Sequence, residues 1–192
     1  MMIIRTTLAA AMALAAVNVT LAQDTSADAK DNAPASQPAS AVPVDPEKLK
    51  QLLPETLSGL KRLEAKAEQT ELAGIKTSKA SASYAGKDLS NPATPRIELV
   101  ISDPSADKSA LKSLRSIARS KVDKEDDKGF HKALKIHDQP AVQQYINADK
   151  SGMLQVVVAG RFYIVLTTFN LSGEEFKKVS DELNIKELAA LK

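Results

Sequence analysis

The stretch that decides the fold is residues 153–169, which read MLQVVVAGRFYIVLTTF. Its two apolar segments, 153–159 and 162–169, are rich in β-branched and aromatic side chains and flank the dipeptide Gly160-Arg161. A glycine in the first position of a two-residue loop is typical of a type II′ turn, so the stretch predicts an antiparallel hairpin. Both faces of this hairpin are apolar, which predicts a central place in a sheet that is covered on both sides.

Other segments predict the rest of the sheet. Apolar and polar residues alternate, as in half-buried strands, over 79–85, 97–101, 130–136 and 142–147. Residues 57–72 are ambiguous, because their composition favours a helix whereas their alternation of charged and apolar residues favours a strand. We lean towards an extended segment there. The expected fold is a single α+β domain, an antiparallel sheet of roughly six or seven strands with flanking helices.

The helices are expected around this sheet. Asp45-Pro46-Glu47 opens a short one, since an N-cap acceptor precedes a proline at the first helical position. Apolar residues at helical spacing predict a longer helix over about 105–122, followed by a charged loop at 123–129. Ser172-Gly173-Glu174-Glu175 is a capping box that starts a third helix, and a short terminal helix follows it.

The first 22 residues have the pattern of a secretory signal peptide. Arg5 supplies a positive charge, residues 8–17 are apolar, and Thr20-Leu21-Ala22 places small residues before a cleavage site near Ala22. The apolar run is shorter than the roughly 20 residues that span a bilayer, so we expect no transmembrane anchor. The mature protein is expected in the periplasm or secreted.

Residues 23–45 are expected to be a disordered linker of Ala, Pro, Ser and Asp, with the folded domain at 46–192. The chain has no cysteine, so neither a disulfide nor a lipid-modified cysteine is expected. Its formal net charge is only +2, which does not resemble the dense basic surface of a nucleic-acid-binding protein. We therefore expect no nucleic acid among its partners.

Two patterns suggest a metal site, but the spacing and the types of their residues argue against both. His131 and His137 would be roughly 20 Å apart on one continuous strand, too far to share an ion. Residues 123–129 carry acids at calcium-loop positions 1, 3 and 5, but Lys128 and Leu134 stand where the loop needs its glycine and its bidentate glutamate. We predict no metal and no cofactor.

Two Ser-x-x-Lys matches, Ser105 with Lys108 and Ser109 with Lys112, suggest a small serine hydrolase. The motifs that accompany such a pair in serine acyl-enzymes are missing, and serine and lysine are common in this region. We predict that the protein has no catalytic residues and is not an enzyme, and keep the hydrolase as an alternative. A second alternative is a carrier that holds an apolar ligand between sheet and helices.

A basic stripe is the one patterned surface feature of the expected 105–122 helix. At about 100° per residue, its four cationic side chains fall within about 60° of one another and away from the apolar stripe. They are Lys108, Lys112, Arg115 and Arg119. Arg161, at the tip of the hairpin, is a second candidate contact. The stripe predicts binding to an anionic partner, an envelope protein or an anionic lipid surface, and the alternative is an ordinary solvated helix face.

Several short pieces of the chain together resemble a group of small exported bacterial proteins of unknown function. They are Leu52-Leu53-Pro54, Leu57-Ser58-Gly59-Leu60-Lys61-Arg62, Ala80-Ser81-Ala82-Ser83-Tyr84, Ile101-Ser102-Asp103 and Gly160-Arg161-Phe162. This resemblance favours a strand at 60–69 and implies no catalytic residue. The expected architecture also resembles PsbP-like α+β domains, an analogy of fold that implies no activity.

Overall fold

The computed structural model describes residues 42–191. The expected signal peptide and residues 23–41 of the expected linker lie outside the described residues. Within the described part, none of the helices is long and apolar enough to span a membrane.

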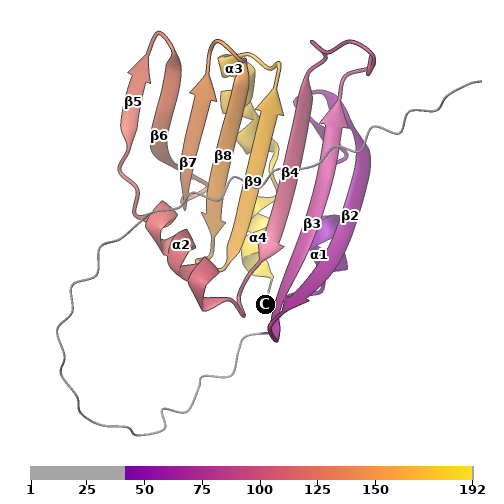
Figure 1. The fold of residues 1–192 in the computed structure, drawn as a ribbon, viewed down its shortest axis with the longest axis vertical. Coiled ribbons are helices and arrows are strands. Elements are labelled where there is room, and N and C mark those ends of the chain that lie inside the picture. The colour runs from indigo at the N-terminus through magenta and orange to yellow at the C-terminus, as the bar shows by residue number, and fades with distance from the viewer. Residues whose placement is uncertain (1–41, 192) are drawn as a thin grey trace, which may run out of the picture. The chain divides into compact units, whose positions relative to one another are not determined.

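The domain is built on one antiparallel sheet. Its strands are β1 (Thr56–Leu57), β2 (Leu60–Leu72), β3 (Ile75–Ala85), β4 (Arg96–Asp103), β5 (Asp123–Asp126), β6 (Gly129–Ile136), β7 (Gln139–Ile146), β8 (Ser151–Val158) and β9 (Phe162–Phe169). They lie side by side in the order β1-β2-β3-β4-β9-β8-β7-β6-β5, so the predicted β8–β9 hairpin is central (Figure 1). The sheet is larger than the six or seven strands expected from the sequence, and most of the domain is sheet.

The two strands that the sequence pattern does not predict are β1 and β5. Each lacks the alternation of apolar and polar residues for a physical reason. β1 has only two residues, which is too short to show a period of two. β5 reads DKED and is exposed along its whole length, so it carries no apolar alternation and the segment was expected to be a loop. Charged side chains suit an edge strand, because they discourage pairing with another chain. Of the ambiguous residues 57–72, Leu57 ends β1, residues 58–59 form a turn, and residues 60–72 form β2, so most of the segment is extended.

The central turn differs from the expected type II′ turn at Gly160-Arg161. Ala159 and Gly160 are its central residues, with φ of 52° and 64°, and the Arg161 N–H donates to the Val158 carbonyl at 3.1 Å. Two positive φ values are characteristic of a type I′ turn, whose twist matches that of the flanking strands. Arg161 is thereby displaced to the position just before β9.

Helices cover parts of both faces of the sheet. They are α1 (Pro46–Gln51), α2 (Lys108–Ala118), α3 (Gly173–Val179) and α4 (Ile185–Ala190), with a 3₁₀ turn at Ser180–Glu182. α1, α3 and α4 lie behind the sheet and α2 lies in front of it, over β7 and β8 (Figure 1). α2 is shorter than the expected 105–122, because Asp107 occupies the N-cap position and Arg119 the C-cap.

The main core lies between the sheet and the helices behind it. Its largest fully buried side chains include Tyr84, Phe162 and Phe176. Phe176 of α3 packs directly on the backbone of Gly152 in β8, where a Cβ atom would come within 2.6 Å of the ring. Even-numbered residues of β8 therefore face α3, and odd-numbered ones such as the buried Val157 face the side on which α2 lies.

The chain enters this core before α1. Pro43 and Val44 are buried, and the Val44 N–H donates to the carboxylate of Asp103 at 2.8 Å. Pro43 and Val44, which the sequence assigned to the linker, thus pack against the domain.

Candidate functional site

The candidate site is the outer face of α2, and Asp107 determines where this helix begins. The Asp107 carboxylate accepts hydrogen bonds from the backbone N–H groups of Ser109, at 2.8 Å, and Ala110, at 3.0 Å. These bonds satisfy two donors that the first helical turn leaves without partners. Leu114, buried to 3% exposure, fixes the rotation of the helix against the sheet.

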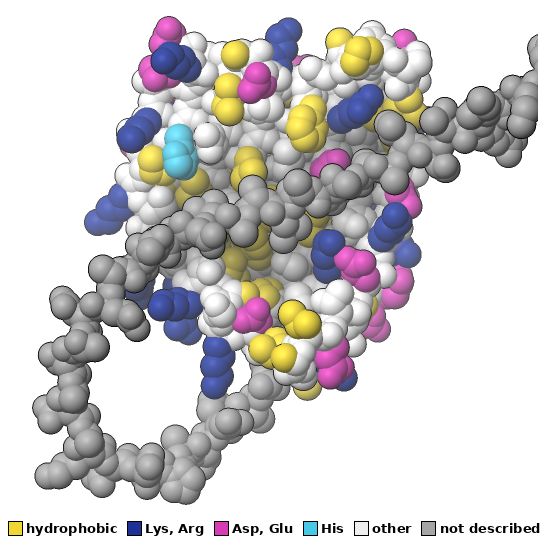
Figure 2. Space-filling model, viewed as in Figure 1, with side chains coloured by type: hydrophobic (Ala, Val, Ile, Leu, Met, Phe, Trp, Pro, Cys, Tyr) yellow, Lys and Arg dark blue, Asp and Glu magenta, His cyan; other side chains and the backbone are white. Residues whose placement is uncertain are grey.

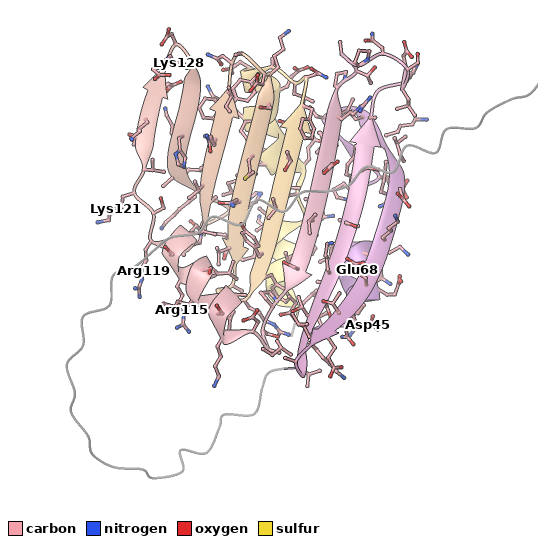
Figure 3. All side chains as sticks on the ribbon, viewed as in Figure 1. Asp45, Glu68, Arg115, Arg119, Lys121 and Lys128 are labelled. Atoms are coloured by element: carbon pink, nitrogen blue, oxygen red, sulfur yellow. The ribbon has the colours of Figure 1, made fainter. Side chains whose placement is uncertain are left out.

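This rotation places four basic side chains in solvent. We call Lys108, Lys112, Arg115 and Arg119 the α2 basic face. All four are exposed, and Figure 3 shows Arg115 and Arg119 pointing away from the sheet. No side chain of the α2 basic face forms an ion pair or a hydrogen bond with any residue of 42–191.

The arrangement is electrostatically unfavourable for the isolated domain. Lys108 and Lys112 are four residues apart on the helix, as are Arg115 and Arg119, and like charges at that spacing destabilise a helix by a few tenths of a kcal/mol per pair. The one acid at the start of α2, Asp107, is engaged as its cap. An anionic partner would relieve this repulsion.

Lys121 extends the same basic surface beyond the end of α2. It is exposed, and in Figure 3 it lies next to Arg119 along the chain and points outwards. Figure 2 shows dark blue side chains gathered on this side of the domain. The sequence pattern missed Lys121 because, in a helix continued to 122, the 100° spacing turns this residue away from the other four. In the structure α2 ends at Ala118, so that spacing does not apply to Lys121.

A groove lies beside the end of α2, between this helix and β6 and β7. It has a volume of about 570 Å³ and mixed walls, with apolar Ile117 and Val122 next to Lys121 and Lys135. It is an open depression at the end of β6, beyond residues 129–132, which pair with β5. Its lysines continue the basic surface of α2 onto the sheet.

Arg161, the second candidate contact, is held by the domain itself. Its guanidinium donates two hydrogen bonds from Nε and one from Nη2 to the fully buried carboxylate of Asp103, the shortest at 2.6 Å. A further bond from Nη2 reaches the Val42 carbonyl at 3.2 Å. The side chain is 26% exposed and also lies over the Phe162 ring, so its contacts are with the fold.

The two Ser-x-x-Lys pairs have different surroundings from those of a nucleophile and its base. Ser105 precedes the helix, so Ser105 and Lys108 do not lie on one helical turn. Ser109 and Lys112 do, but both are exposed. A lysine that acts as a base is normally withdrawn from water.

The metal-ligating residue types are scattered over the described region. No three His, Asp or Glu residues among 42–191 converge where they could hold an ion. His131 lies within β6 and His137 in the turn after it. Residues 123–126, the start of the calcium-loop pattern, form β5.

A comparison of the chain with protein-family models, curated proteins and solved structures found no match. The functional argument therefore depends on the geometry and charge of the described residues.

Proposed function

We propose that this is a non-enzymatic exported protein of the bacterial envelope, periplasmic or secreted after cleavage near Ala22, that binds an anionic partner through the α2 basic face. The observation that carries the proposal is that four neighbouring cationic side chains are exposed and unpaired with any described residue. Elsewhere on the surface, cations are often neutralised locally, as in Lys79 with Glu68 and Lys177 with Glu174.

The spacing of the charges fits an extended partner. From Lys108 to Arg119 the helix rises roughly 16 Å. Each lysine or arginine near an anionic surface contributes about 1 kcal/mol at moderate ionic strength, so four in one row favour a partner with several negative groups. Because the charges are exposed, the interaction must weaken as salt is added.

Charge reversal tests the proposal. An α2 variant combines Lys108→Glu, Lys112→Glu, Arg115→Glu and Arg119→Glu. A matched scattered variant makes the same change of net charge at exposed lysines elsewhere, namely Lys87, Lys128, Lys178 and Lys186. Far-ultraviolet circular dichroism checks that both variants fold.

The two variants are compared on a sulfonated resin and for recovery on a bacterial envelope fraction. The α2 variant should elute from the resin at a clearly lower salt concentration than the scattered variant, and should be lost from the envelope fraction. Equal elution and equal recovery of the two variants would show that net charge alone matters, and the proposal would be wrong.

A further inference from the structure

The β2–β3 hairpin extends beyond the rest of the sheet and ends in an apolar tip. β4 pairs with β3 only as far as Ser78, so residues 70–77 project past it. At the tip, Leu72 and Ile75 pair across the strands and are 82% and 40% exposed. We call these two residues the hairpin tip.

The turn between Leu72 and Ile75 holds its backbone in an unfavourable conformation. Ala73 and Gly74 have φ of 51° and 78°, and a non-glycine residue in the left-handed region costs roughly 1 kcal/mol. The nearest ion pair, Lys76 with Glu71, follows directly behind the tip. Large aliphatic side chains on a strained, projecting turn contribute nothing visible to the core of the described domain.

The hairpin tip and the start of α2, where the α2 basic face begins, lie at the same end of the domain. β4 ends at Asp103, opposite Ser78 of β3, and α2 begins five residues later at Lys108. Figure 1 shows the β2–β3 turn and the start of α2 at the lower end of the sheet.

The two features also face the same side. The register joins Lys79 to Ser102, Ser102 to Tyr163 and Tyr163 to Val157, so these residues share the face of the sheet on which α2 lies. Ile75 is four residues from Lys79 in the same strand and therefore points to that face as well.

We infer that this end of the domain docks on an anionic lipid surface, with the hairpin tip inserted among the acyl chains and the α2 basic face on the headgroups. The inference depends on the proposed function and names its partner. An acidic protein would satisfy the α2 basic face alone and would need a pocket for the hairpin tip. A bilayer supplies both negative groups and hydrocarbon at one interface without a fitted pocket.

The chain offers a direct probe of insertion, because it contains no tryptophan. Leu72→Trp places a single indole at the hairpin tip. Leu89→Trp is the matched control, since Leu89 is also an exposed leucine, 54% exposed, but lies in the β3–β4 loop at the opposite end of the sheet. The probes are vesicles of phosphatidylglycerol mixed with phosphatidylcholine, and vesicles of phosphatidylcholine alone.

With the anionic vesicles, the emission of Leu72→Trp should shift to shorter wavelength and become quenched by brominated acyl chains, whereas that of Leu89→Trp should not change. Neither protein should respond to phosphatidylcholine alone. An unchanged Leu72→Trp spectrum under conditions where the protein co-sediments with anionic vesicles would overturn the inference.

Vesicle co-sedimentation separates this inference from the proposed function. A Leu72→Ser/Ile75→Ser variant should bind anionic vesicles at least about tenfold more weakly than the wild type, because burial of even one large aliphatic side chain corresponds to about that factor. Leu89→Ser should bind like the wild type.

If the α2 variant loses binding while the hairpin-tip variant keeps it, the inference is wrong and the proposed function stands. If the wild type elutes from the resin in an α2-dependent way but ignores anionic vesicles, the lipid partner is likewise excluded. If the α2 variant binds anionic vesicles and the resin as well as the scattered variant does, both proposals fail.

Discussion

The pair formed by Asp103 and Arg161 provides the sharpest test of how the domain is held together. Asp103 is fully buried and accepts hydrogen bonds from Arg161, from the Val44 N–H at 2.8 Å and from the Ser105 N–H at 3.1 Å. Removing one partner of a buried ion pair costs about 3–5 kcal/mol, because the remaining charge is left without compensation. Since the Arg161 side chain is 26% exposed and water can reach it, we expect a smaller loss of about 2–3 kcal/mol for Arg161→Gln.

Urea unfolding followed by circular dichroism measures this loss. With a slope of about 2 kcal/mol per molar urea for a domain of this size, the midpoint should fall by about 1–1.5 M. Asp103→Asn should also destabilise, and the double variant should lose less than the sum of the two single losses, because the groups act on each other.

The surface pair Lys79–Glu68 is the control. Its charged atoms are 2.8 Å apart, against 2.6 Å for Arg161 and Asp103, but the side chains are 41% and 49% exposed. Lys79→Gln should therefore change the stability by less than about 1 kcal/mol. The reasoning is refuted if Arg161→Gln and Lys79→Gln have the same small effect.

Three further measurements test other parts of the structure. Gly152→Ala should destabilise the domain by about 1–3 kcal/mol in thermal unfolding, because the added methyl group would overlap the Phe176 ring. An unchanged melting temperature would contradict the close packing of α3 on β8. Ser172→Ala removes the capping box and should cost about 1 kcal/mol at pH 7. The hydrogen bonds from Ser172 lower the pKa of Glu175. The stabilisation they give is therefore present above the unfolded pKa of about 4.3 and is lost as pH falls through the folded pKa. The loss of stability in Ser172→Ala should shrink in acid, and a loss that does not change with pH would argue against the cap. Burial raises the pKa of every tyrosine in the chain, to about 12 for two of them. Absorbance at 295 nm should therefore show little phenolate at pH 10 in the folded protein, and stability should fall as pH rises from the unfolded pKa of about 10 towards 12. Ionisation of the tyrosines in the folded protein near pH 10 would contradict their burial. The tyrosines are Tyr84, Tyr145 and Tyr163.

Local patterns in the sequence predict much of this fold. The alternation in 79–85 and 97–101 and the apolar run around Gly160 each reflect burial of a strand face, and the structure has strands β3, β4, β8 and β9 there. The capping box at Ser172 likewise starts α3. These features are predictable because the physical cause lies within a few residues of the effect.

The features that escaped prediction depend on distant residues or on exposure. The sequence predicts Arg161 to be a surface contact, because nothing near it in sequence reveals Asp103, which lies 58 residues earlier. β5 pairs through its backbone alone, so its side chains give no signal. The hairpin tip lies where the alternating segment 57–72 ends and before the next one at 79–85, and only the end of β4 at Asp103 shows that it projects. The α2 basic face itself follows from helical spacing, but the absence of partners for it among residues 42–191 required the structure.

The strand order has a consequence for how the chain is made. Within the one sheet, β1 to β4 form one meander and β5 to β9 another, and strands of the two meanders pair only where β4 lies beside β9. β4 is synthesised with an open edge, and its neighbour at 162–169 comes last among the strands. An open edge is a template for wrong pairing until it is filled. Until most of the chain has been synthesised, the N-terminal meander must therefore either wait incompletely folded or be shielded by another protein.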